Sequence, residues 1–269
     1  MTSARMSALA SLRGSIERIE AQSSTLSPAR AALGHSGADA VLQGGLALGA
    51  LHEVFCEGGR QCAAATGFVA GLARRVTRRR PLIWVRQDFS EREVGRLSMS
   101  GLAELGLDPR YLVTVRACDV EDALRTSADA LACDAVGAVV LEVWGETHRL
   151  DLVASRKLTL AAQGAGVTGV LLRIAASPVP STAETRWIVR AAHSPPQGQG
   201  QWQGQWNGWG APRFDAELIR NRHGPTGRWI MEWKCDECLF NETADPQPMA
   251  ATPSHRPHPA RAAIARRAG

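Results

Sequence analysis

Apolar, β-branched runs alternate with segments of helical length through most of this 269-residue chain. The apolar runs occupy residues 51–56, 82–86, 111–116, 137–144 and 167–174, and the helical segments between them occupy residues 62–76, 91–105, 120–133 and 149–164. Apolar strands separated by helices are typical of a parallel sheet that is covered on both faces. The pattern therefore predicts an α/β fold with a mainly parallel sheet flanked by helices.

The alternation stops after residue 176. Residues 185–192, 214–222 and 228–234 have the composition of strands, and no helical segment separates them. The sequence HGPTG at 223–227 is typical of a hairpin turn. We expect these segments to be antiparallel strands added at one edge of the sheet.

The sequence divides into three predicted parts. Residues 1–30 form an amphipathic helix and a Ser-rich linker, residues 31–240 form the core, and residues 241–269 form a disordered basic tail. Residues 194–212, rich in Gln, Gly and Trp, are predicted to be a flexible insertion in the core. The N-terminal helix carries an apolar stripe made of Leu9, Leu12, Ile16 and Ile19. We expect this stripe to bind a partner, although the helix could instead pack on its own core.

Composition excludes several classes of protein. No apolar run is long enough to span a membrane, and the N-terminus lacks the features of a secretory signal. Six cysteines in a chain of this size indicate reduced thiols and a cytoplasmic protein. The net charge is +5, but residues 247–269 hold four arginines and no acid, so the rest carries only 5 − 4 = +1. A nearly neutral body favours indirect or weak contact with DNA.

The turn after residues 51–56 occupies the place of a phosphate-binding loop, which needs glycines, a lysine and a hydroxyl. Cys56 and Gln61 replace the two defining glycines, Cys62 replaces the lysine, and Ala63 replaces the hydroxyl residue. The chain has two lysines, and neither follows a glycine-rich turn. No nucleotide cofactor and no catalytic residue are therefore expected at the degenerate loop positions, which are Cys56, Gly58, Gly59, Gln61, Cys62 and Ala63.

Four segments carry a resemblance to a known family: LQGGLALGALHEVF (42–55), VVLEVWG (139–145), ETRWIV (184–189) and FDAELIRNRHGPTGRWIMEW (214–233). Their order over residues 37–235 resembles the RecA-like ATPase core and, more narrowly, the SulA-related ImuA family. The resemblance implies an SOS-induced accessory protein of bacterial mutagenesis. Its implied partners are RecA, the Y-family polymerase relative ImuB and a DnaE-type error-prone polymerase.

Two further acidic positions correspond, by this resemblance, to catalytic positions of an active RecA-like enzyme. Glu142 ends an apolar strand where the resemblance implies a magnesium-holding acid, and we interpret it as a vestige of that position at a solvated strand end. Asp88 or Glu91 would have to activate water, but Asp88 is placed as a natural helix cap in QDFSERE. Neither acid has a bound nucleotide on which to act.

Several other patterns have a structural and a functional interpretation. Cys235 and Cys238 have metal-ligand spacing, but they lack a second pair, so reduced thiols are favoured over zinc. The arginines at 74, 75, 78, 79 and 80 either complement a helix end or contact phosphate. The tryptophans at 202, 206 and 209 belong to a linker or stack on bases. Arg220 and Arg222 are expected to form salt bridges in the hairpin, with a role against a partner subunit left open.

Three functions remain compatible with the sequence. The favoured function is a non-enzymatic adapter of error-prone DNA synthesis. The second is a SulA-like inhibitor of cell division, and the third is a divergent RecA-like ATPase. The missing phosphate loop and the neutral body favour the adapter.

Overall fold

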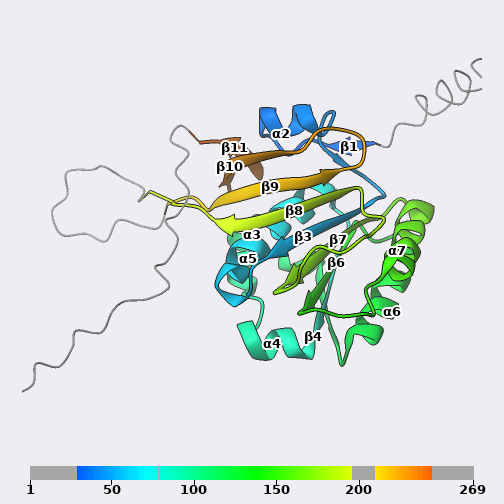
Figure 1. Cartoon of the computed structure of the whole chain (residues 1–269). Helices are drawn as coiled ribbons and strands as arrows, with labels where there is room; N and C mark the ends of the chain where they lie inside the picture. Colours follow the sequence, from blue (N-terminus) through cyan, green and yellow to red (C-terminus); the bar gives the residue numbers. More distant parts are fainter. Residues whose placement is uncertain (1–28, 78, 196–209, 244–269) are drawn as a thin grey trace, which may run out of the picture.

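The computed structural model describes residues 29–77, 79–195 and 210–243. Within them, a nine-stranded sheet has the strand order β11-β10-β9-β8-β3-β7-β6-β4-β5 (Figure 1). Its strands are, in chain order, β3 (Leu51–Cys56), β4 (Leu82–Gln87), β5 (Leu112–Ala117), β6 (Ala138–Trp144), β7 (Thr168–Ile174), β8 (Thr185–Ala191), β9 (Arg213–Asn221), β10 (Gly227–Lys234) and β11 (Leu239–Glu242). A two-stranded sheet pairs β1 (Arg30–Ala31) with β2 (Leu46–Ala47).

The helices cover the sheet from both sides. They are α2 (Ser36–Val41), α3 (Gly59–Val76), α4 (Asp88–Val94), α5 (Met99–Glu104), α6 (Val120–Leu131) and α7 (Leu152–Ala165), with a 3-10 turn η1 (Pro109–Tyr111). Helices α6 and α7 enclose one apolar core, and α3 and α5 enclose the other, on the opposite face (Figure 1). The predicted α/β fold with a mainly parallel sheet and C-terminal antiparallel strands is confirmed.

Two details of the prediction are wrong. Strand β8 was expected among the antiparallel strands, but it pairs in parallel with β3 and antiparallel only with β9. The single helix expected at 91–105 is two helices, α4 and α5. Gly95 ends α4 with a φ of 79°, a conformation that favours glycine, and the Ser98 hydroxyl then accepts from the Gly101 N–H to begin α5.

Aromatic side chains fasten α3 to the antiparallel strands. Trp233 packs edge-on against Phe240 at 4.7 Å between ring centroids, and Phe68 of α3 lies 5.2 Å from Phe240. A Cβ at Gly71 would stand 2.6 Å from the Phe240 ring, so the close approach of the helix requires glycine there. Strand β11, which supplies Phe240, was not predicted because CLFNE is too short to show a period.

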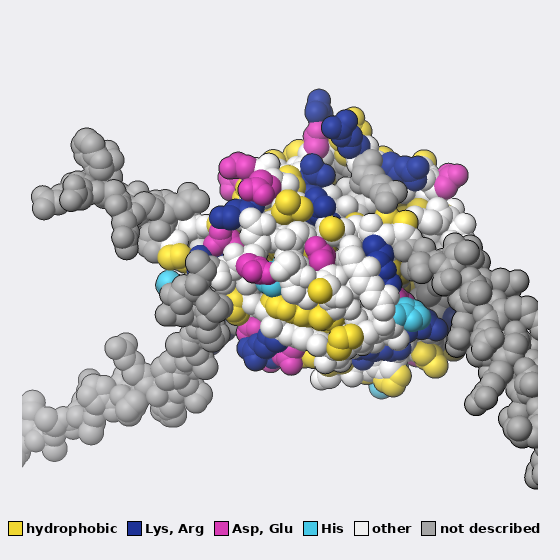
Figure 2. Space-filling model, turned by 90° about the horizontal axis from the view of Figure 1, so that it is seen from above, with side chains coloured by type: hydrophobic (Ala, Val, Ile, Leu, Met, Phe, Trp, Pro, Cys, Tyr) yellow, Lys and Arg dark blue, Asp and Glu magenta, His cyan; other side chains and the backbone are white. Residues whose placement is uncertain are grey.

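The turn at 223–227 joins β9 to β10, as predicted. The hairpin is salt-bridged, but not by the predicted residues. Its ion pairs are Arg228 with Asp215 and Arg213 with Glu232, the latter at 2.7 Å. Seen from the side of α2, acidic and basic side chains are interspersed on the surface (Figure 2).

Candidate functional site

The carboxyl ends of the parallel strands β3, β4, β6 and β7 meet at one edge of the sheet. Open α/β sheets bind their ligands outside this edge. In this chain the edge holds the turn from β3 to α3, the end of β4 and the end of β6. The degenerate loop positions and Glu142 therefore lie at the one edge where sequence reasoning expected a vestigial site.

Only Glu57 and Gly58 separate β3 from α3. Gly58, with a φ of 73°, makes the turn, and the helix begins at Gly59. The positions that correspond to the lysine and the hydroxyl of a phosphate loop, Cys62 and Ala63, therefore lie within the helix. The connection is therefore shorter than the loop between strand and helix in a phosphate-binding motif.

The other residues of this turn are held by the core. The Gln61 amide oxygen accepts a hydrogen bond from the Ala191 N–H at 2.8 Å, which ties the start of α3 to β8. Burial raises the pKa of the Cys56 thiol to about 12, with a smaller contribution from Cys62. Burial likewise raises the pKa of Cys62. Burial therefore favours the neutral thiol form of both side chains.

Glu142 is fully buried, so its interpretation as a solvated strand end is wrong. The Arg86 guanidinium on the neighbouring strand β4 donates to both carboxylate oxygens, at 2.8 and 2.9 Å. The Trp84 indole N–H donates to one of them at 3.1 Å. The carboxylate is therefore neutralised by a bidentate arginine at the position where the resemblance implied a metal-holding acid.

The second acidic position also differs from the prediction. Asp88 is the first residue of α4 rather than its cap, and its carboxylate accepts from Arg116 at 2.9 Å. Glu91 accepts from Arg96 at the same distance. Both acids belong to ion pairs with Arg116 of β5, and Glu91 also pairs with Arg96 of the α4–α5 connection.

A cleft of about 590 Å³ lies between the start of α3 and the α4–α5 connection. Its wall includes Cys62, Thr66, Arg86, Leu97 and Leu105. The one buried cation among these, Arg86, is already paired with Glu142. The wall also holds Glu93 and Arg96, the latter paired with Glu91, so apolar and charged side chains both line the cleft.

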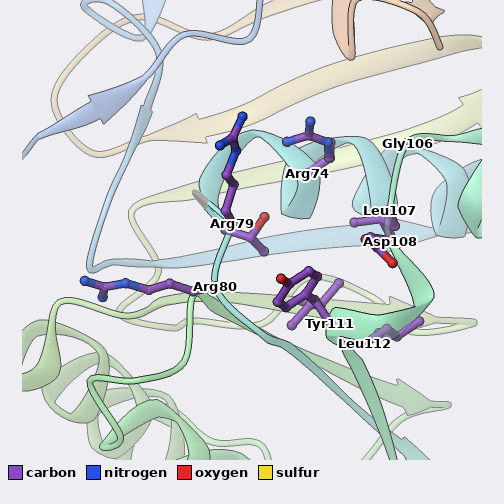
Figure 3. Close-up of a pocket in the computed structure, with 10 residues that line it drawn as sticks. Arg74, Arg79, Arg80, Gly106, Leu107, Asp108, Tyr111 and Leu112 are labelled. Carbon is purple, nitrogen blue, oxygen red and sulfur yellow. The ribbon is translucent and has the colours of Figure 1, made fainter.

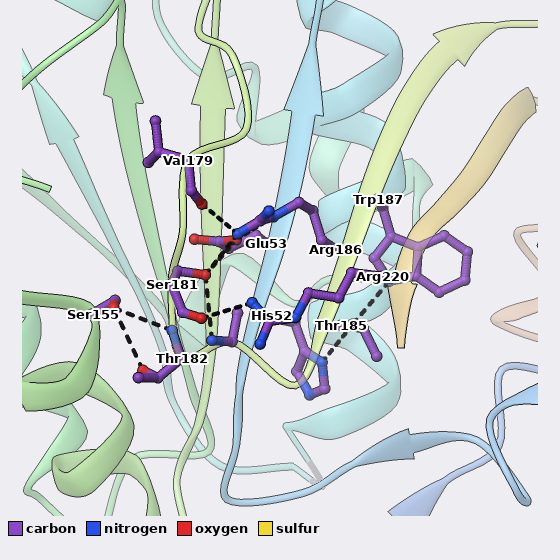
Figure 4. A network of polar contacts seen from close by, with 11 residues as sticks. His52, Glu53, Ser155, Val179, Ser181, Thr182, Thr185, Arg186, Trp187 and Arg220 are labelled. Atoms are coloured by element: carbon purple, nitrogen blue, oxygen red, sulfur yellow. Dashed lines mark hydrogen bonds and ion pairs between the residues drawn. The ribbon is translucent and has the colours of Figure 1, made fainter. Parts of the chain in front are cut away.

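A polar network on the other side of β3 was not predicted (Figure 4). The Glu53 carboxylate accepts from Arg186 of β8 and from the Ser181 hydroxyl, both at 2.8 Å. His52 beside it is buried, and burial lowers its pKa to about 4. Its Nε2 donates to the Ala47 carbonyl at 2.8 Å. The network holds the connection from β7 to β8 against the sheet.

Arg220 belongs to this network and not to a salt bridge (Figure 4). Its guanidinium donates to the Ser181 carbonyl at 2.6 Å. Arg222 uses its backbone N–H, which donates to the Glu184 carbonyl at 3.0 Å. Among the described residues neither arginine has an acidic partner, so the expected salt bridges of these two residues are wrong, and Arg220 instead supports the β7–β8 connection.

The remaining candidates are spread over the chain. All six cysteines are free thiols, as predicted, and Cys235 and Cys238 flank the β10–β11 turn. Within the described ranges no group of three His, Cys, Asp or Glu side chains could hold a metal ion, and no helix there is long and apolar enough to cross a bilayer. Some predictions lie outside these ranges: the apolar stripe of Leu9, Leu12, Ile16 and Ile19, residues 244–269 of the tail and the tryptophans of the insertion. The start of the predicted disordered tail at residue 241 is wrong, because Asn241 and Glu242 belong to β11 and pair with β10.

Sequence reasoning missed the Arg86–Glu142 pair although both residues had been read as strand ends. Each is a charged residue after an apolar run, and the two charges are opposite. The two residues are 56 positions apart in the sequence, and only the adjacency of β4 and β6 brings them together. The two opposite charges could thus be seen in the sequence, but pairing them required knowledge of the strand order.

Fold and site together define an α/β protein with a mainly parallel sheet, a two-residue turn between β3 and α3, and a buried ion pair between Arg86 and Glu142. No protein-family model matches the chain. It is 34% identical over 203 residues to the protein named Protein ImuA from two strains of Caulobacter vibrioides, and each alignment covers 70% of this chain and 77% of the relative. The chain belongs to the ImuA family.

Proposed function

We propose that this chain is a non-enzymatic adapter of error-prone DNA synthesis. In this proposal it docks on RecA, on ImuB or on both, and it helps to bring a DnaE-type error-prone polymerase to damaged DNA in the cytoplasm. Membership of the ImuA family supports the setting, because the name of the matched relatives points to a mutagenesis cassette. The partners follow from the resemblance of the sequence to that family.

One observation carries the non-enzymatic part of the proposal, namely the closed Arg86–Glu142 pair. To hold a magnesium ion, the Glu142 carboxylate would have to release a buried arginine. Separating a buried ion pair leaves a charge without compensation, which costs about 3–5 kcal/mol. The two-residue turn before α3 adds to this obstacle, because it offers no cradle for the phosphates of ATP.

The purified protein is therefore expected neither to bind nor to hydrolyse Mg·ATP at physiological concentrations. Isothermal titration and a phosphate-release assay measure the two properties. The matched variant Cys62→Lys with Ala63→Thr should not gain binding, because both positions lie within α3 and Arg86 still occupies Glu142. Specific micromolar binding of Mg·ATP to the wild-type chain would contradict the proposal.

The N-terminal helix is proposed as the docking element. Changing Leu12→Asp together with Ile16→Asp should abolish pull-down of RecA or ImuB, because two charges interrupt the apolar stripe. The melting temperature should stay nearly unchanged. The matched control is Val153→Asp with Leu160→Asp on α7, where the side chains are 74% and 55% exposed. We expect this control to retain binding. A large drop in the melting temperature of the first variant would show instead that the helix packs on its own core.

A further inference from the structure

A second hollow lies at the opposite edge of the sheet from the Arg86–Glu142 pair. It is a pocket of about 250 Å³ between the end of α3, the turn that leads into β4, and the segment that leads into β5 (Figure 3). Because α3 has 18 residues, the pocket lies roughly 27 Å from the degenerate loop along the helix. It is therefore separate from the vestigial site.

One wall of the pocket is cationic. Arg74 at the end of α3 and Arg79 in the following turn extend to one side, toward the top of the view, Arg80 extends to the left, and Tyr111 lies below Arg74 and Arg79 (Figure 3). Neither Arg74 nor Arg79 forms an ion pair with any acid in residues 29–77, 79–195 and 210–243. The one acid on the wall, Asp108, is already bound by Arg110 through contacts of 2.7 to 3.1 Å. The pocket thus has an excess of positive charge.

The helix end does not by itself account for this charge. A cation near the last turn of a helix complements its dipole, and Arg75 already does so in α3. Its guanidinium donates to the Ala32 carbonyl at 2.7 Å and to the Cys238 carbonyl at 3.3 Å. Burial lowers the pKa of Arg75, and the nearby charge of Arg74 lowers it further. Arg74 therefore adds a second positive charge that repels Arg75, at a helix end whose dipole Arg75 already complements.

The backbone of Arg79 is also costly. Its φ is 66°, the left-handed conformation that a residue with a Cβ rarely adopts. Such a conformation costs on the order of 1 kcal/mol and is concentrated at sites with a functional constraint. Glycine or asparagine would fit the turn better, yet the chain places an exposed arginine there.

The other walls are apolar and aromatic. Leu82, Leu107 and Leu112 line the pocket, and Tyr111 stands beside them with half of its side chain, 50%, exposed (Figure 3). An exposed aromatic ring next to arginines is the arrangement by which proteins stack a nucleobase and hold the adjoining phosphate. The volume of about 250 Å³ lies just below the range of about 300–1,000 Å³ that is typical of small-molecule sites, so it leaves room for a small ligand only.

We propose that this pocket binds a nucleoside phosphate, with the phosphate held by Arg74 and Arg79 and the base stacked on Tyr111. The same chemistry is offered by a free nucleotide and by one residue of single-stranded DNA. The proposal does not depend on the adapter function, because it requires neither RecA nor ImuB.

The test uses the full chain at physiological ionic strength, because phosphate contacts are screened by salt. Isothermal titration with dTMP, thymidine and inorganic phosphate measures the affinity for the whole nucleotide and for each of its two parts. Fluorescence anisotropy of a fluorescein-labelled single-stranded oligo(dT) measures the affinity for DNA. We expect saturable binding of dTMP, with thymidine and inorganic phosphate each at least about tenfold weaker, because each lacks one of the two contacts. An oligo(dT) that binds more tightly and is displaced by dTMP identifies DNA as the source, whereas dTMP binding without oligo(dT) binding identifies a free nucleotide.

Three variants and a control make the result specific. Arg74→Gln with Arg79→Asn should weaken binding by about tenfold or more, and Tyr111→Ala should weaken it by about fivefold or more. Arg79→Gly should weaken binding while keeping the melting temperature, because glycine accepts the positive φ. The control Arg125→Gln with Arg156→Gln removes two exposed charges from α6 and α7 and should change binding less than about twofold. Absence of saturable binding by both dTMP and oligo(dT), or equal losses in the control, would overturn the proposal.

Discussion

Replacing Arg86 with leucine is expected to lower the free energy of unfolding by about 3–5 kcal/mol, because it leaves the buried Glu142 carboxylate without its cation. For a core of this size the melting temperature should fall by roughly 10 °C. Urea and thermal unfolding followed by circular dichroism measure both quantities. The effect is large because Glu142 is fully buried and has no water to replace the two hydrogen bonds from Arg86.

Two controls separate the buried pair from surface charge. The double variant Arg86→Leu with Glu142→Leu should recover most of the loss, since no buried charge is left, although the Trp84 N–H loses its acceptor. Arg96→Gln, which breaks a pair in which the arginine is 84% exposed, should change stability by less than about 1 kcal/mol. If Arg86→Leu had as little effect as Arg96→Gln, Glu142 would not depend on Arg86, and its role as a metal ligand would have to be reconsidered.

Deleting the gene is expected to reduce damage-induced mutation to the spontaneous level while homologous recombination stays intact. An adapter that positions a polymerase is required only for error-prone synthesis, so its loss should leave the ATP-driven filament of homologous recombination unaffected. The frequency of rifampicin resistance after ultraviolet exposure measures the first property in the deletion strain. The same strain carrying the wild-type gene on a plasmid is the control.

Overproduction distinguishes the adapter from an inhibitor of cell division. Without DNA damage, the overproduced adapter should leave cell length normal, because an adapter of error-prone synthesis is not expected to bind the division machinery. An inhibitor would block septation and produce long cells, and its deletion would leave the mutation frequency unchanged. Long cells on overproduction together with an unchanged mutation frequency would favour the inhibitor over our proposal.

The alternation of apolar runs and helical segments predicted the strands well. The ranges 51–56, 82–86 and 167–174 agree with β3, β4 and β7 to within a residue, because strands that are buried on both faces leave continuous apolar runs. The break between α4 and α5 was missed, since Gly95 was not read as a helix end. The short strand β11 escaped because four residues show no period.

The candidate site was predicted in part. The sequence was sufficient to show that Cys62 and Ala63 replace a lysine and a hydroxyl, because these are chemical identities. It could not show that α3 begins at Gly59, so that the loop itself is only two residues long. It also placed Glu142 in solvent, because burial of a charged residue depends on the partner that tertiary structure provides.

The sequence by itself determined the local properties of this protein: which segments form strands and helices, where turns must occur, and which chemical groups the chain lacks. These follow from the period of apolar residues and from the identity of side chains at adjacent positions. The tertiary structure alone decided which distant residues meet. Strand order sets Arg86 of β4 beside Glu142 of β6, and the end of α3 sets Arg74 across a pocket from Tyr111. Such pairs are separated by tens of residues, and their energies depend on distance and burial in space, quantities that local sequence does not contain.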